Sequence, residues 1–495
     1  MAKHRRVPAP SPARLRVATA TAAAAALTGG LFVASTVSAT AATRGVAASD
    51  ADFNGDGVAD VATSAPTAYV NGHARAGVVS VLYGGGAHAT FSQNTAGVPG
   101  SAETGDRFGG DTAYGDFNGD GYDDLAVSAD SEDVGSDADG GTVAILWGSA
   151  KGLSGGTTVQ DPRPTKHDYF GSYLEAADLN GDGKDDLAVA TVNAATVDII
   201  RGGFTSAGAT GGSYTLATFI ESGRFADGTP MGAAFLQSGD ANGDGIDDLI
   251  VNGWSAGTND NTNFWYPGSA SGVRSSHYQD LDAGIITDIG DVNSDGYDDI
   301  ITGLDADSGV HLAQKGGAVL IELGSSVGPE NNGTRVIDQD TAGVPGTGET
   351  GDGFGWDIDL GDINGDGRLD LVVGTPGENL DGISDAGSVT VLYGAADGSG
   401  ITATGAKFFS QDTPGVPNSN EKNDYFGSDV HVDDLDDDGR GDVVIGASGE
   451  NGGNGAVYTL HSHTDDTLSA PAGIYTSTLG ISASGSPQLG ANFAD

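Results

Sequence analysis

The sequence predicts an all-β fold built from seven similar units, and three observations lead to this expectation. The pattern Asp-x-Asn-x-Asp-Gly-x-x-Asp, clearest in Asp116–Asp124, recurs seven times in 495 residues, with Asp436 in place of the asparagine in the last copy. Each copy runs into a short apolar segment such as Leu125-Ala126-Val127, which is typical of a buried strand. No longer segment shows the 3.6-residue period of an amphipathic helix. Seven related units point to one repeat domain rather than several independent domains.

The spacing of the units indicates their size. Successive copies of the pattern begin 64, 62, 62, 51, 71 and 72 residues apart, which is too long for a helical solenoid repeat. A second apolar strand follows each first one after a Gly-rich loop, as in Gly77–Gly84 and Gly387–Gly394. Such a unit has room for a four-stranded blade with sizeable loops. We therefore expect a seven-bladed β-propeller of four-stranded blades.

The acidic pattern itself has the properties of a calcium loop. It offers oxygen donors at positions 1, 3, 5 and 9 and a free backbone carbonyl at position 7, while the position-6 glycine lets the chain turn back tightly. Calcium takes 6–8 such ligands, and an all-protein oxygen cage suits it better than Mg²⁺. We expect up to seven Ca²⁺ ions. The predicted ligands are Asp52, Asn54, Asp56, Val58, Asp60; Asp116, Asn118, Asp120, Tyr122, Asp124; Asp178, Asn180, Asp182, Lys184, Asp186; Asp240, Asn242, Asp244, Ile246, Asp248; Asp291, Asn293, Asp295, Tyr297, Asp299; Asp362, Asn364, Asp366, Arg368, Asp370; and Asp434, Asp436, Asp438, Arg440, Asp442.

EF-hand and dockerin loops open with the same residues, and position 12 distinguishes them. An EF-hand needs a glutamate there and a helix on each side. In this chain position 12 is mostly a strand-forming residue: Thr63, Val127, Val189, Val251, Thr302, Val373 and Ile445. The propeller loop is the better interpretation.

A second marker precedes the acidic loops. Phe-Gly stands eight residues before the first ligand at Phe108, Phe170, Phe354 and Phe426, with weakened forms at Met231-Gly232 and Ala283-Gly284. With these motifs the chain resembles the FG-GAP repeat family, the calcium-binding β-propeller of integrin α-subunit heads and of many secreted bacterial proteins. The resemblance implies that the Phe-Gly strand is innermost, that the cation loop joins it to the second strand, and that a Gly-Ala-Pro-like turn follows.

The first loop, at Asp52, has no Phe-Gly strand before it, and the C-terminus supplies a candidate. Leu489–Asp495 has the character of the start of that strand. We expect it to complete the N-terminal blade and close the ring, which would leave only short, protected sheet edges.

The N-terminal segment differs from the rest of the chain. Residues 1–41 carry Lys3, Arg5 and Arg6 before an Ala/Thr/Val-rich run that ends at Ala39-Thr40-Ala41, as in a secretory signal peptide. We expect cleavage to leave residues 42–495 as a secreted propeller domain. The chain has no cysteine, so we expect calcium rather than disulfides to stabilise the fold. Its formal charge of −48 makes nucleic acid and anionic membranes poor partners.

These features predict a monomeric, non-catalytic recognition or adhesion module for an extracellular protein or carbohydrate ligand. The connectors between blades and the loops between second and third strands fall on the face opposite the cation loops. By resemblance to integrins, the ligand is expected on that face. The alternative is a secreted polysaccharide lyase or hydrolase with acids converging at the central channel, although no catalytic pair stands out among so many carboxylates.

Two short motifs suggest other functions. Arg440-Gly441-Asp442 spells a tripeptide that many integrins recognise, but Asp442 is the last ligand of the seventh loop and leads into a predicted buried strand. Gly253-Trp254-Ser255-Ala256-Gly257 matches the nucleophile elbow of serine hydrolases, which requires a helix after the serine, and the following residues are poor helix formers. Trp254 is expected to be an exposed loop aromatic.

Overall fold

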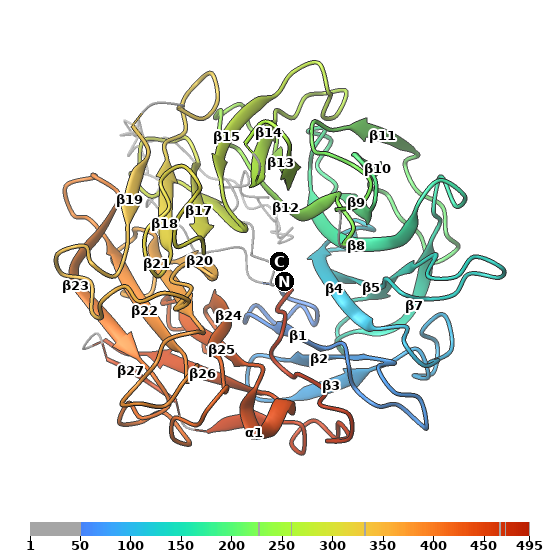
Figure 1. Cartoon of the computed structure of the whole chain (residues 1–495). Helices are drawn as coiled ribbons and strands as arrows, with labels where there is room; N and C mark the ends of the chain where they lie inside the picture. The colour runs from blue at the N-terminus through green and yellow to red at the C-terminus, as the bar shows by residue number, and fades with distance from the viewer. Residues whose placement is uncertain are drawn as a thin grey trace, which may run out of the picture.

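Seven antiparallel sheets stand around a central axis and form a closed ring (Figure 1). The computed structural model describes residues 51–494 except 226–227, 259, 331–332, 465–466 and 471. The predicted signal peptide, residues 1–41, lies outside the described residues. The all-β, seven-bladed propeller expected from the sequence is confirmed. Within the described part of the chain, no helix is long and apolar enough to span a membrane.

Each blade is a meander whose strands follow one another from the axis outward. The blades are, in order, β1 (Val61–Ala65), β2 (Val78–Leu82), β3 (His88–Phe91); β4 (Phe108–Gly115), β5 (Asp124–Ala129), β6 (Thr142–Trp147), β7 (Ser154–Val159); β8 (Asp168–Ala177), β9 (Asp186–Val192), β10 (Thr196–Ile200), β11 (Ser213–Ala217); β12 (Ala233–Gly239), β13 (Asp248–Ser255), β14 (Asp260–Tyr266), β15 (Gln279–Ala283); β16 (Ile286–Gly290), β17 (Asp299–Leu304), β18 (Ala318–Glu322), β19 (Arg335–Ile337); β20 (Asp357–Gly361), β21 (Asp370–Thr375), β22 (Ser388–Gly394), β23 (Ile401–Phe409); and β24 (Phe426–Asp433), β25 (Asp442–Ala447), β26 (Ala456–Ser462), β27 (Leu468–Ser469), β28 (Gly473–Tyr475). A short turn, α1 (Glu450–Gly453), joins β25 to β26, and its backbone is left-handed at Asn451 and Gly452.

The C-terminal segment supplies the innermost strand that the first blade lacks. Phe493 forms an antiparallel bridge with Thr63 of β1. The Ser64 N–H donates to the Asn492 carbonyl at 2.8 Å, and the Ala494 N–H donates to the Ala62 carbonyl at 3.0 Å. The predicted closure of the ring is therefore confirmed.

The core lies between neighbouring sheets rather than at the axis. Phe108, at the start of β4, is buried among Val79 and Val81 of the first blade and Leu125 and Val127 of its own. Phe426 occupies the same position between the sixth and seventh blades. The Phe-Gly marker is thus the residue that packs one blade against the next.

The weakened marker Ala283-Gly284 keeps the place of a complete Phe-Gly marker. Ala283 stands three residues before Ile286, where the inner strand β16 of the fifth blade begins, just as Phe354 stands three residues before Asp357, where β20 begins. Ala283 is also the last residue of β15, so the outer strand of the fourth blade runs directly into this marker.

A glycine before the third strand of most blades allows the neighbouring blade to approach closely. Gly387 has φ +83° and forms a parallel bridge with Phe426. A Cβ at this position would fall well inside contact distance of the Phe426 backbone N and O atoms. Gly317 and Phe354 repeat the arrangement one blade earlier.

Replacing Gly387 with alanine is expected to lower the free energy of unfolding by about 3 kcal/mol or more. Both the left-handed backbone and the clash with a rigid main chain contribute to this loss. Gly382 is the matched control, because it has φ +85° but nothing within 4 Å of an added Cβ. Gly382→Ala should cost only about 1 kcal/mol in the same urea denaturation experiment. Equal losses for the two variants would contradict the close-approach argument.

Candidate functional site

The seven predicted cation loops all lie on one face of the ring. Each loop leads into the second strand of its blade, so that Asp124, Asp186 and Asp370 are the first residues of β5, β9 and β21. Because strands alternate in direction within each blade, equivalent loops emerge on the same side. We call this side the cation-loop face. The opposite side, with the connectors between blades and the loops between second and third strands, is called the connector face.

Every loop has the same hydrogen-bond skeleton around its first aspartate. In the second loop, Asp116 Oδ1 accepts the Asp120 N–H at 3.0 Å and Asp116 Oδ2 accepts the Gly121 N–H at 2.9 Å. Asp120 Oδ1 accepts the N–H of Tyr122, the position-7 residue, at 3.1 Å. The other six loops repeat all three bonds. The predicted ligands at positions 1, 5 and 7 are thus brought together in a tight turn in every blade.

The position-9 carboxylates are the most buried members of the loops. All seven are fully buried: Asp60, Asp124, Asp186, Asp248, Asp299, Asp370 and Asp442. In the sixth loop, Asp370 Oδ1 accepts the Gly394 N–H at 2.8 Å, and Asn364 Nδ2 donates to both carboxylate oxygens. Burial raises the pKa of Asp370 to about 8; repulsion from Asp362 and Asp366 adds to the rise, and the hydrogen bond from the Gly394 N–H opposes it.

The pKa of the position-9 carboxylate is raised in other loops as well, and this bears on whether the loops fit a cation. Burial raises the pKa of Asp124 to about 8 and the pKa of Asp299 to about 7, again with repulsion from two carboxylates of the same loop. Three clustered acids, one of them out of water, are unfavourable unless a positive charge joins them. The donor set is entirely oxygen, which suits a hard divalent cation. These acidic groups could therefore hold a metal ion.

The last loop has one further candidate metal ligand, His461, which was not predicted from the sequence. One carboxylate oxygen from each of Asp434, Asp436 and Asp438 lies within 4.8 Å of the others. His461 of β26 also approaches this loop, with Nδ1 2.8 Å from Asp442 Oδ2. In the sequence, only the closely spaced histidines His461 and His463 hinted at this contact. It could not be predicted from them, because it depends on where β26 lies relative to the loop.

Neighbouring cation loops are linked by a carboxylate at position 8. Asp123 Oδ2 accepts the N–H of Asp52, the first ligand of the preceding loop, at 2.8 Å. Asp247 Oδ2 accepts the Asp178 N–H at 2.9 Å, and Asp298 Oδ2 accepts the Asp240 N–H at 3.0 Å. The sequence shows these aspartates next to predicted ligands but gives no indication of their partners, which lie in another blade.

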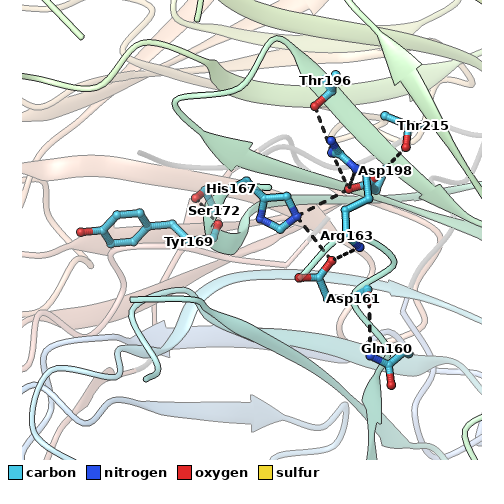
Figure 2. Close-up of polar contacts among 9 residues, drawn as sticks. All are labelled: Gln160, Asp161, Arg163, His167, Tyr169, Ser172, Thr196, Asp198 and Thr215. Carbon is cyan, nitrogen blue, oxygen red and sulfur yellow. Dashed lines mark hydrogen bonds and ion pairs between the residues drawn. The ribbon is translucent and has the colours of Figure 1, made fainter. Parts of the chain in front are cut away.

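On the connector face, a polar cluster anchors the connector that leads into the third blade (Figure 2). Arg163 donates to both carboxylate oxygens of Asp198 in β10, at 2.7 to 3.1 Å, and Thr215 donates to Asp198 Oδ1 at 2.7 Å. His167 Nε2 lies 3.4 Å from Asp161 Oδ1 and 3.9 Å from Asp198 Oδ2. The His167 side chain is buried, stacks on Phe170, and neither ring nitrogen makes a hydrogen bond among the described residues.

Asp161, His167 and Asp198 have the composition of a metal site, but Arg163 argues for a structural role. Its guanidinium already neutralises Asp198, and a divalent cation bound there would be repelled by it. Beside the cluster lies a hollow of about 630 Å³ lined by Lys166, Asp168 and Asn193 among others. The cluster therefore forms part of the connector face beside this hollow.

Truncating Arg163 to alanine is expected to cost about 3 kcal/mol or more of unfolding free energy. The change leaves the Asp198 carboxylate, which is not exposed at all, without its counter-ion. Arg335→Ala is the control, because that side chain is exposed and, within the described part of the chain, its one polar contact is with the Ser399 carbonyl at 3.4 Å. Urea denaturation would show the difference, and equal stability of the two variants would contradict the assignment.

Acids on the innermost strands are also engaged between blades. Asp357 Oδ2 accepts the Val430 N–H at 2.6 Å, and Asp359 Oδ2 accepts the Val432 N–H at 2.7 Å. Across another interface, Asp111 Oδ2 accepts the Leu174 N–H at 2.8 Å. These carboxylates hold adjacent inner strands together.

Neither short motif has the structure that its suggested function requires. Asp442 of the Arg-Gly-Asp tripeptide is fully buried and hydrogen-bonded to Ser462, so the tripeptide is not displayed. Ser255 of the Gly-x-Ser-x-Gly match is the last residue of β13, and β14 begins at Asp260, which leaves no room for the helix of a nucleophile elbow. The expectation of an exposed Trp254 is wrong, because it lies in β13, is only partly exposed and packs edge-on against Phe225 with centroids 4.8 Å apart.

Comparison with known proteins identifies the repeat. The FG-GAP repeat matches residues 45–82, 354–392 and 426–460, and the FG-GAP-like repeat matches residues 116–189. A phosphatidylinositol-glycan-specific phospholipase D of Mus musculus is 33% identical over 160 residues, which are 32% of this chain and 19% of that protein. Integrin alpha-PS5 of Drosophila melanogaster is 33% identical over 158 residues, 30% of this chain and 15% of that protein. The chain thus spans a fifth or less of these relatives.

Among solved structures, an exotype rhamnogalacturonan lyase matches with a TM-score of 0.42 and 13% identity. The match covers 82% of this chain and 70% of that one. A protein from Lactobacillus plantarum matches with a TM-score of 0.47 and 12% identity, over 88% of this chain and 98% of that one. Neither similarity is close enough to support a functional argument.

Proposed function

Because this chain is a propeller of FG-GAP repeats, we propose that it is a secreted, monomeric, calcium-dependent recognition module for an extracellular protein or glycan. Residues 1–41 would be its signal peptide, and residues 42–495 the mature propeller. Calcium in the loops of the cation-loop face would fix the ring, and the connector face would bind the ligand.

The observation that carries the proposal is the contrast between the two faces. On the cation-loop face, all seven loops keep one hydrogen-bond skeleton and one set of acids. On the connector face, the loops between second and third strands range from three residues, 193–195, to thirteen, 305–317. Constant loops suit a shared structural ion, whereas variable loops on a rigid scaffold suit recognition. The similarity to an integrin α chain supports a protein ligand.

Recognition is favoured over catalysis by the state of the inner-strand acids. A lyase or hydrolase built on this scaffold would need carboxylates free to act on a substrate at the channel. Asp357, Asp359 and Asp111 instead accept backbone N–H groups of the neighbouring blade. These carboxylates therefore stabilise the contacts between blades, and bound calcium would also stabilise the ring.

The proposal is tested by incubating residues 42–495 in calcium buffer with a panel of matrix proteins and polysaccharides. Retention and the release of reducing or unsaturated sugar ends would be measured in the same tubes, with a chelator control. We expect calcium-dependent retention of the protein without product. Release of sugar ends would contradict the recognition function and indicate an enzyme. Absence of retention on the whole panel would also count against the recognition function.

A further inference from the structure

The connector face of the seventh blade contains a polar hollow of about 400 Å³. It is lined by Asn418, Ser419, Glu421, Glu450, Asn451 and Tyr475. The first three belong to the connector between β23 and β24, Glu450 and Asn451 to α1, and Tyr475 to β28. β28 pairs with β26 and is an addition specific to this last blade.

A buried glutamate organises the walls of this hollow. Glu450 is 4% exposed, and its Oε2 accepts Gln411 Nε2 at 2.5 Å. Its Oε1 accepts the side-chain amide N–H groups of Asn418 at 2.8 Å and Asn451 at 2.9 Å. The Tyr475 hydroxyl in turn donates to Asn418 Oδ1 at 2.9 Å. One carboxylate therefore fixes two amides and, through one of them, an aromatic ring.

Two other blades contain the glutamine–glutamate pair without these walls. Gln93 donates to Glu132 at 2.7 Å, and Gln339 donates to Glu378 at 2.5 Å, with the same spacing of 39 residues. The pair itself is therefore part of the scaffold. In the second blade, Gln93 and Glu132 border a space of only about 60 Å³. What distinguishes the seventh blade is the set of side chains around the pair.

Asn418 replaces a glycine that the same turn uses elsewhere. Seven residues after the glutamine, the other two blades have Gly100 with φ +92° and Gly346 with φ +105°. Asn418 adopts φ +72° at this position, and Asn451 across the hollow adopts φ +55°. Asparagine tolerates left-handed backbone better than most residues with a Cβ. Asn418 can therefore take the place of the glycine in this turn while adding an amide side chain to the hollow.

The lining also indicates what kind of ligand would fit. Asn451 and Ser419 offer donors and acceptors, Glu421 offers acceptors, and Tyr475 offers an aromatic surface with a hydroxyl. None of the six lining residues is cationic, and two are acidic, so a carboxylated or sulfated ligand would be repelled. A ligand with many hydroxyl groups, an apolar ring face and no negative charge matches this set.

We propose that this hollow is a binding site for a neutral sugar residue, held by Asn451, Ser419 and Glu421 against the Tyr475 ring. The inference rests on the proposed recognition function and gives it a ligand class. Glu450 is a positioning residue, because its oxygens are engaged with Gln411, Asn418 and Asn451. Its task is to hold the amides in place before the ligand arrives.

The test uses residues 42–495 with calcium and a panel of free sugars. Glucose, galactose, mannose, N-acetylglucosamine and their short oligomers serve as neutral probes, and glucuronate serves as the anionic one. Saturation-transfer NMR detects binding and calorimetry measures affinity. We expect at least one neutral sugar to bind and glucuronate not to bind.

Variants then assign the binding to the hollow. Asn418→Gly restores the residue of the other blades, so it should fold, and its melting temperature verifies this. Asn418→Gly and Asn451→Ala should each weaken sugar binding at least about tenfold. Asn379→Ala is the matched control, since Asn379 follows Glu378 as Asn451 follows Glu450, and it should leave sugar binding unchanged.

Three results would overturn the inference. Failure of every sugar to bind, while calcium-dependent retention on a matrix protein persists, would reject the sugar site and leave the proposed recognition function standing. Sugar binding that survives both Asn418→Gly and Asn451→Ala would place the site elsewhere. Binding of a lysine-rich peptide that Asn451→Ala abolishes, with no sugar binding, would assign the acidic hollow to a cationic protein partner.

Discussion

Chelation of calcium from residues 42–495 is expected to lower the melting temperature by more than about 10 °C. A ligand that binds only the folded state stabilises it by RT ln(1 + [L]/Kd). With Kd of about 10⁻⁴ M and free calcium of about 2 mM, each filled loop contributes about 1.8 kcal/mol. Seven filled loops would contribute about 13 kcal/mol, which is comparable to the whole stability of many domains. Scanning calorimetry with and without chelator measures the shift.

Two controls make this result specific to the loops. Restoring excess calcium after chelation should return the original melting temperature. Replacing Asp370, whose fully buried carboxylate belongs to one loop, with asparagine should reduce the calcium-dependent part of the shift. A melting temperature that does not respond to chelator would contradict the structural role of calcium.

Deletion of residues 487–495 is expected to destabilise the entire ring by more than about 5 kcal/mol. Leu489 and Phe493 are fully buried, and loss of a buried phenylalanine side chain alone costs about 3–5 kcal/mol. The deletion also removes the strand pairing with Thr63 and exposes the edge of β1. We expect a large drop in the melting temperature, or a chain that is recovered only as aggregate.

Point variants keep this prediction testable if the truncated chain does not fold. Phe493→Ala should lower the melting temperature clearly and Phe493→Leu much less, since leucine restores most of the buried volume. Ser484→Ala, at an exposed position just before the closing segment, should change little. Equal melting temperatures for Phe493→Ala and Ser484→Ala would show that the C-terminus does not close the ring.

The parts of the structure that could be predicted from sequence are those that each blade repeats locally. The acidic loop, the apolar strand after it and the Phe-Gly marker lie within about twenty residues of one another, so a single blade contains the whole pattern. Seven copies then fix the number of blades. Closure by Leu489–Asp495 could be inferred because the first blade lacked an innermost strand.

The remaining features depend on contacts between blades, which no local pattern encodes. Asp123 bonds to a residue of the preceding loop, and Arg163 reaches Asp198 on a strand of the following blade. The hollow of the seventh blade needs Tyr475, 57 residues from Asn418. Sequence could place each of these residues in its own blade, but the partners meet only when the ring is assembled.

The central claim is that the loops of the cation-loop face bind calcium, and equilibrium dialysis followed by metal analysis tests it most directly. Residues 42–495 would be dialysed against increasing calcium, and bound ions would be counted per chain. The account predicts saturable binding of several ions, up to seven, with dissociation constants of about 10⁻⁴–10⁻³ M. Less than one bound ion per chain at millimolar calcium would contradict it.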